Sequence, residues 1–427
     1  MVTTSQTSID WFLEARFGIF VHFGLYSGAA RHEWVQHHER LTDDQYRPYF
    51  EHFDPDRFDA VALARAAKSA GAGYVVLTTK HHEGFSLWDT ALSEFSSQAA
   101  CGRDLVREYV EALRAEGLRV GLYHSLIDWH HPDFPVDWIH PLRDDPAGVA
   151  LNEGRDIARY RAFLHGQVRE LLTDYGQIDY LFFDFTYPEA TVGWAGKGPQ
   201  DWGSEELLAM CRELQPGIVV NDRLGIPGDF VTPEQYQPTS PLTIDGVPQV
   251  WEACQTMNGS WGYDRDNVNF KPASLLVQML VDSVSMDGNM LLNVGPDGRG
   301  AITPHDAATL AEIGAWMDLH RDAVVGAGHA PFTPPREGVY TLRGNRLYLA
   351  LHTWPLGFVH LPGLAGTLTY ARLLNDGSWL RTSTPDPGQE TNSMTPAAEA
   401  EDTLTVHLPV RRPDVLLPVI ELTLTAG

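Results

Sequence analysis

Five short apolar segments of this sequence each end in side chains that can bind a polar ligand or take part in acid–base chemistry. A single polar residue at the end of such a segment is usually a satisfied structural group. Five segments in succession that end this way favour a functional site. The segments span residues 18–23, 74–79, 119–125, 180–185 and 218–222, and the side chains at or after their ends are His22; Lys80, His81, His82 and Glu83; His124 and Asp128; Asp184; and Asn221, Asp222 and Arg223.

These residue types suit three kinds of chemistry. The sequence contains 18 histidines, but neighbouring residues on a strand point to opposite faces and no HxH or HExxH spacing occurs, so a metal site is disfavoured. An inactive carbohydrate-binding barrel fits the abundance of tryptophan, histidine and carboxylates. A retaining glycosidase needs two carboxylates, groups that bind sugar hydroxyls, and an aromatic wall. Composition leaves these last two possibilities open.

The elements that carry these side chains alternate between two patterns. The five segments, and two more at residues 250–256 and 289–294, are short and apolar, as is typical of parallel strands buried on both faces. Amphipathic stretches lie between them at 58–71, 105–117, 154–175, 204–215, 273–286 and 304–320. This order predicts a (β/α)8-like barrel over residues 1–330, with the C-terminal strand ends gathered at the active face. No GxGxxG follows the first segment, which disfavours a dinucleotide-binding fold.

The pattern changes near residue 332. Proline, glycine and threonine there punctuate short alternating runs, such as GVYTLRGNRLYLALHTW at 338–354 and VLLPVIELTLT at 415–425. Short strands with frequent turn signals predict a C-terminal antiparallel β-sandwich over residues 331–427.

Length and charge narrow the class of protein. The 427 residues are 43% hydrophobic and 20% charged, which is typical of a globular chain of roughly two or three domains. A net charge of −25 disfavours nucleic acid as a partner and leaves small neutral substrates unaffected. Three widely spaced cysteines indicate no disulfide framework. Neither a signal peptide nor a membrane span is apparent, so we expect a cytoplasmic protein with no membrane contact.

Motifs over residues 10–330 resemble those of the α-L-fucosidases of glycoside hydrolase family 29. The combination of KHHEGF with LLNVGPDG is the most specific part of the resemblance. The matching motifs, in chain order, are HFGLYS (22–27), EWV (33–35), TTKHHEGFSLWDT (78–90), GLYHSLIDWHHPDF (121–134), NDRLG (221–225), TPEQY (232–236), SWGYD (260–264) and GNMLLNVGPDGRG (288–300). The resemblance implies a (β/α)8-like barrel, a β-sandwich, and retaining hydrolysis with neither a metal nor another cofactor.

The resemblance also assigns the two catalytic carboxylates. Asp184, inside YLFFDF, corresponds to the nucleophile, although Phe185 follows it where the family often has glycine. Glu234, eleven residues beyond Arg223, corresponds to the acid/base. Glu252, on the strand-like segment 250–256, is the rival for that second role.

The same matching predicts the rest of the sugar pocket. Histidines would bind hydroxyls, Arg223 would orient the acid/base loop, and Trp261 would pack beneath the deoxy-sugar methyl group. Asn293 also lies at a strand end, but the Gly-Pro turn that follows it is expected to hold the fold. The substrate-binding set is His22, Glu33, Trp34, His81, His82, His124, Arg223 and Trp261, of which His124 stands where the family has tyrosine.

The expected function is an exo-acting retaining α-L-fucosidase that releases terminal L-fucose from a fucosylated oligosaccharide or glycoconjugate. A barrel glycosidase for a related sugar, such as an α-L-galactoside, is the first alternative. A catalytically inactive carbohydrate-binding barrel is the second, and it would be favoured if neither Glu234 nor Glu252 reached the pocket.

Overall fold

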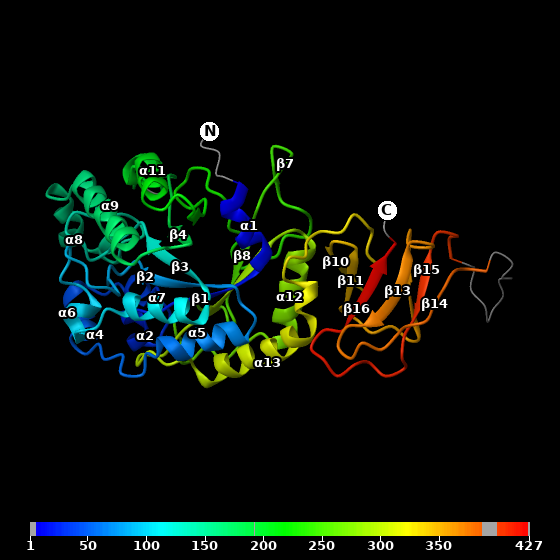
Figure 1. Cartoon of the computed structure of the whole chain (residues 1–427). Coiled ribbons are helices and arrows are strands. Elements are labelled where there is room, and N and C mark those ends of the chain that lie inside the picture. The colour runs from blue at the N-terminus through cyan, green and yellow to red at the C-terminus, as the bar shows by residue number, and fades with distance from the viewer. Residues whose placement is uncertain (1–5, 192, 387–398, 426–427) are drawn as a thin grey trace.

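The chain forms a barrel of strands and helices, at the left of Figure 1, and a smaller all-β part at the right. The computed structural model describes residues 6–191, 193–386 and 399–425. Within these residues, seven parallel strands form one curled sheet in the order β5-β4-β3-β2-β1-β9-β8. They are β1 (Phe17–Val21), β2 (Tyr74–Lys80), β3 (Arg119–Ser125), β4 (Tyr180–Asp184), β5 (Val219–Val220), β8 (Glu252–Gln255) and β9 (Asn289–Val294). Each matches its predicted segment to within two residues.

An irregular segment, residues 230–234, fills the gap between β5 and β8. It makes single parallel bridges to both sides, which join Asn221 to Phe230, Val231 to Trp251 and Glu234 to Cys254. Proline cannot donate a ladder hydrogen bond; Pro227 precedes this segment and Pro233 lies within it. The segment therefore closes the sheet without forming a regular strand, which confirms the (β/α)8-like barrel.

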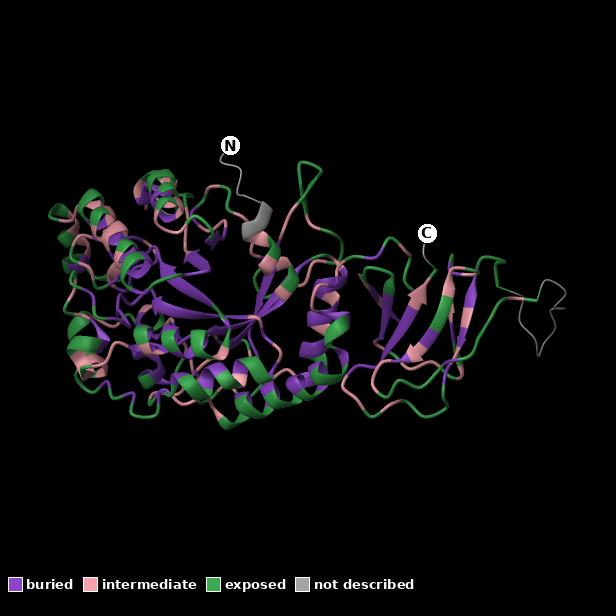
Figure 2. Cartoon of the chain, in the orientation of Figure 1, coloured by how far each residue is buried: buried purple, intermediate pink, exposed green. Residues whose placement is uncertain are grey.

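The barrel interior is filled by alternate residues of the seven strands, which are buried except at Arg119, which begins β3, and Asp184, which ends β4 (Figure 2). Phe12 of α1 (Gln6–Ala15) enters at the N-terminal end, where its ring packs 5.7 Å from Tyr74 and 6.1 Å from Tyr180. A Cβ on Gly18 would lie 2.3 Å from the Tyr74 ring, so glycine is required for this packing. These rings close one end of the barrel and leave the other end for the polar side chains.

Helices cover the outside of the barrel, with exposed outer faces and buried inner ones (Figure 2). In α7 the predicted face of Leu105, Val106, Tyr109, Val110 and Leu113 is buried, and the helix ends at Gly117 in the left-handed conformation. No helix among the described residues has the length and apolarity needed to cross a membrane. The barrel helices after α1 are α2 (Leu25–Ala29), α3 (Val35–His38), α4 (Asp43–Glu51), α5 (Ala60–Ser69), α6 (Ser97–Cys101), α7 (Leu105–Glu116), α8 (Pro146–Ala150), α9 (Ile157–Asp174), α10 (Pro199–Trp202), α11 (Ser204–Leu214), α12 (Ala273–Ser285) and α13 (Pro304–His320); a short hairpin of β6 (Thr243–Ile244) and β7 (Val247–Pro248) precedes β8.

Two antiparallel sheets pack face to face in the C-terminal part and confirm the predicted sandwich. Their shared core is built from Leu347, Leu349, Leu361 and other buried aliphatic residues. The Trp316 indole of α13 donates to the Leu417 carbonyl at 2.7 Å and ties the sandwich to the barrel. The sheets are β10 (Gly338–Arg343), β11 (Arg346–Leu351), β16 (Val419–Leu424) and β13 (Leu368–Leu373); and β12 (Phe358–Leu361), β15 (Leu404–His407) and β14 (Thr382–Ser383). The exact domain boundary at residues 330 and 331 stays a prediction.

Candidate active site

A pocket of about 110 Å³ lies at the C-terminal ends of the barrel strands. Asp184 ends β4, Glu234 lies on the closing segment, and Arg223 follows β5, so three different elements bring the charged groups together. The lining residues are Phe20, His22, Trp34, His81, His82, Tyr123, Phe182, Asp184, Phe185, Arg223, Glu234, Cys254 and Trp261. The strand ends therefore meet at one site, as the sequence predicted.

The Asp184 carboxylate is held by neighbours on both sides. Its Oδ2 accepts a hydrogen bond of 2.9 Å from the Tyr123 hydroxyl, and its Oδ1 lies 3.2 Å from an Arg223 nitrogen. Burial raises the pKa of Asp184 to about 6, while the positive charge of Arg223 opposes the rise. This carboxylate is fixed and, above about pH 6, ionised.

Arg223 also contacts the second carboxylate. Its guanidinium donates to Glu234 Oε2 at 2.8 Å through one terminal nitrogen and to Asp184 through the other. Thr232, on the closing segment, accepts from Arg223 Nε at 2.6 Å and fixes the guanidinium plane. The Glu234 side chain is 42% exposed and that of Asp184 is 16% exposed. One carboxylate thus lies deep in the pocket and the other near its mouth.

Glu252, the predicted rival of Glu234, lies at the opposite end of the barrel. It begins β8 and accepts hydrogen bonds from the hydroxyls of Tyr74 and Tyr180, which begin β2 and β4. It is fully buried, and burial raises its pKa to about 7. Glu252 therefore does not reach the pocket.

Three histidines of the predicted set line the pocket. His22 Nδ1 lies 2.7 Å from Asn293 Oδ1, and His82 Nδ1 lies 2.7 Å from Ser125 Oγ. The His81 ring lies flat against Tyr123. Burial lowers the pKa of His22 to about 3 and the pKa values of His81 and His82 well below the ordinary value. All three are neutral imidazoles, which suit sugar hydroxyls.

His81 and His82 both face the pocket although they are adjacent in sequence. The pairing of β2 with β3 shifts register between Thr78 and Lys80, and this bulge redirects the residues that follow. The two rings are 4.0 Å apart. The expectation that adjacent histidines point to opposite faces is therefore wrong here. Even so, no group of three His, Cys, Asp or Glu side chains in the described part of the chain is arranged to hold a metal ion.

His124 is not part of the pocket, which corrects the prediction. Residues of β3 alternate between the barrel interior and the helix layer, and Tyr123, not His124, points inward. The His124 ring is buried against Trp88, and its Nδ1 lies 3.2 Å from Thr79 Oγ1. The tyrosine that the family resemblance implied is thus the preceding residue.

Glu33 is also displaced from the predicted sugar-binding set. Its side chain is buried, and its Oε2 accepts the backbone N–H groups of Trp261 at 3.2 Å and Gly262 at 2.8 Å. Trp34, the next residue, does line the pocket, with its ring 4.9 Å from His82. Glu33 therefore holds the Trp261 segment, and only Trp34 of the pair faces the pocket.

Phe185 extends the aromatic wall beside Asp184. Its φ of 84° lies in the left-handed region that favours glycine. The ring packs 5.1 Å from Trp34 and 5.0 Å from His82. The phenylalanine that replaces the family's usual glycine is thus kept at a strained backbone position by ring contacts at the pocket.

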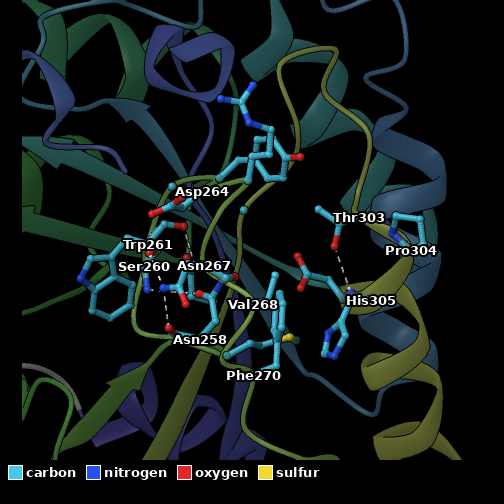
Figure 3. Close-up of a pocket in the computed structure, with 17 residues that line it drawn as sticks. Asn258, Ser260, Trp261, Asp264, Asn267, Val268, Phe270, Thr303, Pro304 and His305 are labelled. Carbon is cyan, nitrogen blue, oxygen red and sulfur yellow. Dashed lines mark hydrogen bonds between the residues drawn. The ribbon is translucent and has the colours of Figure 1, made fainter. Parts of the chain in front are cut away.

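A larger cavity of about 320 Å³ adjoins the other side of the Trp261 segment (Figure 3). Its loop is held by Asn267, whose amide donates to the Asn258 carbonyl at 2.7 Å and to Ser260 Oγ at 2.9 Å. The indole of Trp261 lies away from the centre of this cavity in Figure 3. The smaller pocket is the candidate active site because it alone, of the two, holds Asp184 and Glu234.

Sequence reasoning missed several pocket residues. Tyr123 and Phe20 lie in the apolar strand segments, and the sequence assigned neither of them to the site, although both line the pocket. Strand alternation relative to His22 identifies Phe20, because residues two apart share a face. The same rule identifies Cys254, which lies two positions after Glu252 on β8.

Fold and pocket together define a barrel glycoside hydrolase whose chemistry rests on two carboxylates. Comparisons with known proteins narrow this class. The sequence profile of the α-L-fucosidase family matches residues 2–322. The tissue α-L-fucosidase of Bos taurus is 32% identical in an alignment of 377 residues that covers 81% of this chain and 75% of the bovine one. The chain therefore belongs to the α-L-fucosidase family.

Solved structures agree over almost the whole chain. α-L-Fucosidase isoenzyme 1 from Paenibacillus thiaminolyticus superposes with a TM-score of 0.91 at 43% identity, and the match covers 99% of this chain and 100% of that one. A family 29 α-L-fucosidase from Bacteroides thetaiotaomicron, trapped as a covalent intermediate with 2-fluoro-fucosyl fluoride, gives a TM-score of 0.83 at 27% identity, with 99% and 97% of the chains covered. The likeness includes the C-terminal β-sandwich as well as the barrel.

Proposed function

We propose that this protein is an exo-acting retaining α-L-fucosidase that releases terminal L-fucose from fucosylated glycans. The observation that carries the proposal is the Arg223 guanidinium, which contacts the Asp184 and Glu234 carboxylates at once. Retaining enzymes place their two carboxyl groups only about 5–5.5 Å apart, and a shared guanidinium is compatible with this closeness. The trapped intermediate of the Bacteroides relative supports the same double displacement.

In the first step, an Asp184 oxygen attacks the anomeric carbon while the Glu234 carboxyl gives its proton to the glycosidic oxygen. The bond between that carbon and oxygen breaks, the leaving sugar departs as an alcohol, and a β-fucosyl ester forms on Asp184. In the second step, Glu234 takes a proton from water, whose oxygen attacks the same carbon and releases Asp184. Two inversions return the α-configuration.

The assignment of roles follows from the two environments. Tyr123 and Arg223 orient Asp184 at a rigid strand end, which suits in-line attack. Glu234 lies near the mouth of the pocket on an irregular segment, where it can reach both the leaving group and water. A pocket of about 110 Å³ supports binding of a single terminal sugar.

The apolar wall supports L-fucose over L-galactose. The rings of Phe20 and Trp261 lie 5.9 Å apart on one side of the pocket, and an apolar surface suits a methyl group in place of a hydroxymethyl group. The binding-protein alternative is not favoured, because Glu234 lines the pocket.

The test is hydrolysis of an aryl α-L-fucoside followed by proton NMR. We expect α-L-fucose to appear first and the β-anomer to follow by mutarotation. The matching aryl α-L-galactoside should react about 10- to 100-fold more slowly, since an apolar pocket discriminates weakly against one added hydroxyl. First release of the β-anomer, or faster reaction of the galactoside, would contradict the proposal.

A further inference from the structure

Asn293, near the end of β9, makes two hydrogen bonds that together determine the protonation of His22. Its Nδ2 donates to the Trp261 carbonyl at 2.6 Å. A carbonyl can only accept, so this bond fixes which end of the amide faces which neighbour. The remaining amide oxygen, Oδ1, lies 2.7 Å from His22 Nδ1. Because an amide oxygen also only accepts, Nδ1 of His22 carries the proton.

Ser125 determines the protonation of His82 by the same logic. Its Oγ lies 2.8 Å from the Ile127 carbonyl and has a single proton, which must point to that carbonyl to avoid two facing lone pairs. The His82 Nδ1 lies 2.7 Å from the same Oγ, so it must donate. Ser125 Oγ also accepts the Ile127 N–H at 3.1 Å. His82 is therefore protonated on Nδ1 as well.

We propose that Asn293 and Ser125 are positioning residues that lock His22 and His82 in the neutral Nδ1-protonated form, so that both present an Nε2 lone pair to the sugar. The sugar hydroxyls that meet these two atoms must then donate their protons. Substrates with a proton-free group in those positions, such as fluorine or a methyl ether, lose the contact. The inference rests on the proposed function only for the identity of the sugar.

The same locking protects the carboxylate of Asp184. The Nε2 of His82 lies 3.8 Å from Asp184 Oδ2. Without a proton, this nitrogen cannot donate to the carboxylate and reduce its nucleophilicity.

Burial removes the doubly protonated forms. The pKa of His22 is lowered to about 3, mainly by burial, with His32 adding repulsion. Burial lowers the pKa of His82 as well, and the nearby His22, His37 and Lys80 oppose a further positive charge. Each ring is therefore neutral at neutral pH, and its tautomer is the remaining variable.

The direct test is nitrogen-15 NMR of the histidine rings in the wild-type protein without ligand. We expect the Nδ1 nitrogens of His22 and His82 at the shift of a protonated ring nitrogen and both Nε2 nitrogens at that of an unprotonated one. Spectra of H22Q and H82Q assign the signals. An Nε2-protonated ring at either position overturns the proposal, whatever the activity of the enzyme.

A matched pair of variants tests the function of the lock. Asn293→Ala removes both amide bonds, and Asn289→Ala removes a buried asparagine from the other end of β9, where Nδ2 donates to the Phe12 carbonyl at 2.7 Å. We expect Asn293→Ala to populate the second tautomer of His22 and to weaken L-fucose binding about 10- to 100-fold, the loss typical of one or two good hydrogen bonds. Asn289→Ala should leave both properties unchanged. Equal loss in both variants, or an unchanged His22 spectrum in Asn293→Ala, contradicts the proposal.

Ser125→Ala provides the corresponding test for His82. Its ring should show a mixture of tautomers, while the His22 signals remain as in the wild type. If Asn293→Ala does not fold, the wild-type spectrum and Ser125→Ala still decide. Normal tautomers in a protein that releases no fucose would refute the proposed function and leave the lock intact.

Discussion

The two ends of the barrel carry buried carboxyl groups in closely similar surroundings. At the open end, Asp184 accepts a hydrogen bond from Tyr123. At the closed end, Glu252 accepts hydrogen bonds from Tyr74 and Tyr180. Burial raises both pKa values, to about 6 for Asp184 and about 7 for Glu252. A perturbed pKa and tyrosine partners therefore do not by themselves distinguish a functional carboxylate from a structural one.

The difference lies in charge and access. Asp184 has Arg223 beside it and a second carboxylate, Glu234, on the same guanidinium, and its side chain reaches the pocket. Glu252 has no arginine or lysine within salt-bridge distance among the described residues and is sealed beneath Phe12 and the tyrosine rings. A buried acid becomes a candidate for catalysis when a cation keeps it ionised and a substrate can reach it.

Of the changes that test this comparison, removal of the Asp184 carboxylate should have the largest effect on turnover. Asp184→Ala should lower kcat on the order of 10⁴-fold or more, because the covalent intermediate cannot form. Azide should restore part of the rate and yield the β-fucosyl azide, since a small anion can occupy the vacated space. Circular dichroism checks that the variant folds. Near-normal turnover would remove Asp184 from the mechanism.

Glu234→Gln should have the next largest effect, and its size should depend on the leaving group. General acid–base catalysis contributes about 10²- to 10⁴-fold, and it matters most when the leaving alcohol is poor. Oligosaccharide hydrolysis should therefore suffer far more than formation of the intermediate from an activated aryl fucoside. With that substrate the intermediate should accumulate, which mass spectrometry of the intact protein detects. Equal losses with both substrates would indicate a binding role.

A matched pair of tyrosine variants compares the two ends directly. Tyr123→Phe removes the hydroxyl that donates to Asp184, and Tyr180→Phe removes one that donates to Glu252 at 2.6 Å. A hydrogen bond to a charged group is worth about 1.5–3 kcal/mol, so Tyr123→Phe should lower kcat about 10- to 100-fold. Tyr180→Phe should lower the free energy of unfolding and leave kcat unchanged. Loss of kcat in Tyr180→Phe, with a lower free energy of unfolding and normal kcat in Tyr123→Phe, would mean that the closed end is the catalytic one.

Most of the fold could be predicted because buried strands and amphipathic helices leave strong patterns in a sequence. The closing segment at residues 230–234 could not, since its single bridges depend on neighbours on both sides and not on local propensity. Only the family resemblance predicted that Glu234, on this segment, reaches the pocket. The sequence pattern thus predicted the regular strands and helices better than the irregular closing segment.

The errors in the site have two physical causes. Both faces of β3 are buried, so no alternation of polar and apolar residues marks which face is interior, and His124 was chosen in place of Tyr123. The role of Glu33 depends on Trp261, a residue 228 positions away, which no local pattern reports. By contrast, Asp184 is the last residue of β4 and Arg223 lies three residues after β5, where the fold leaves little freedom.

The smallest expected effect on turnover comes from Glu252→Gln, which should instead alter how stability depends on pH. Glu252 has a pKa of about 7 in the folded protein against an ordinary value of 4.5. The folded state therefore binds this proton more tightly than the unfolded state, and stability falls as pH rises from about 4.5 to above 7. Buried histidines act in the opposite direction: His22 stays neutral down to about pH 3, so its contribution to stability grows with pH up to 6.5 and then levels off.

Above pH 6.5 the carboxyl contributions, from Glu252 and also from Glu83 with a pKa of about 8, should dominate. Glu252→Gln cannot lose a proton, so its free energy of unfolding should decline less as pH rises from about 4.5 to above 7, by up to roughly 3 kcal/mol for the full titration. At pH 5 the variant should be less stable than the wild type by about 1–3 kcal/mol, because one tyrosine hydroxyl must then accept from the amide nitrogen, and its own proton loses the carboxyl oxygen as a partner. Urea unfolding at several pH values measures both effects.

The fall of kcat/KM below about pH 6, which reports Asp184, should be the same in variant and wild type. A shifted acid limb in Glu252→Gln would show that the closed end of the barrel takes part in catalysis after all.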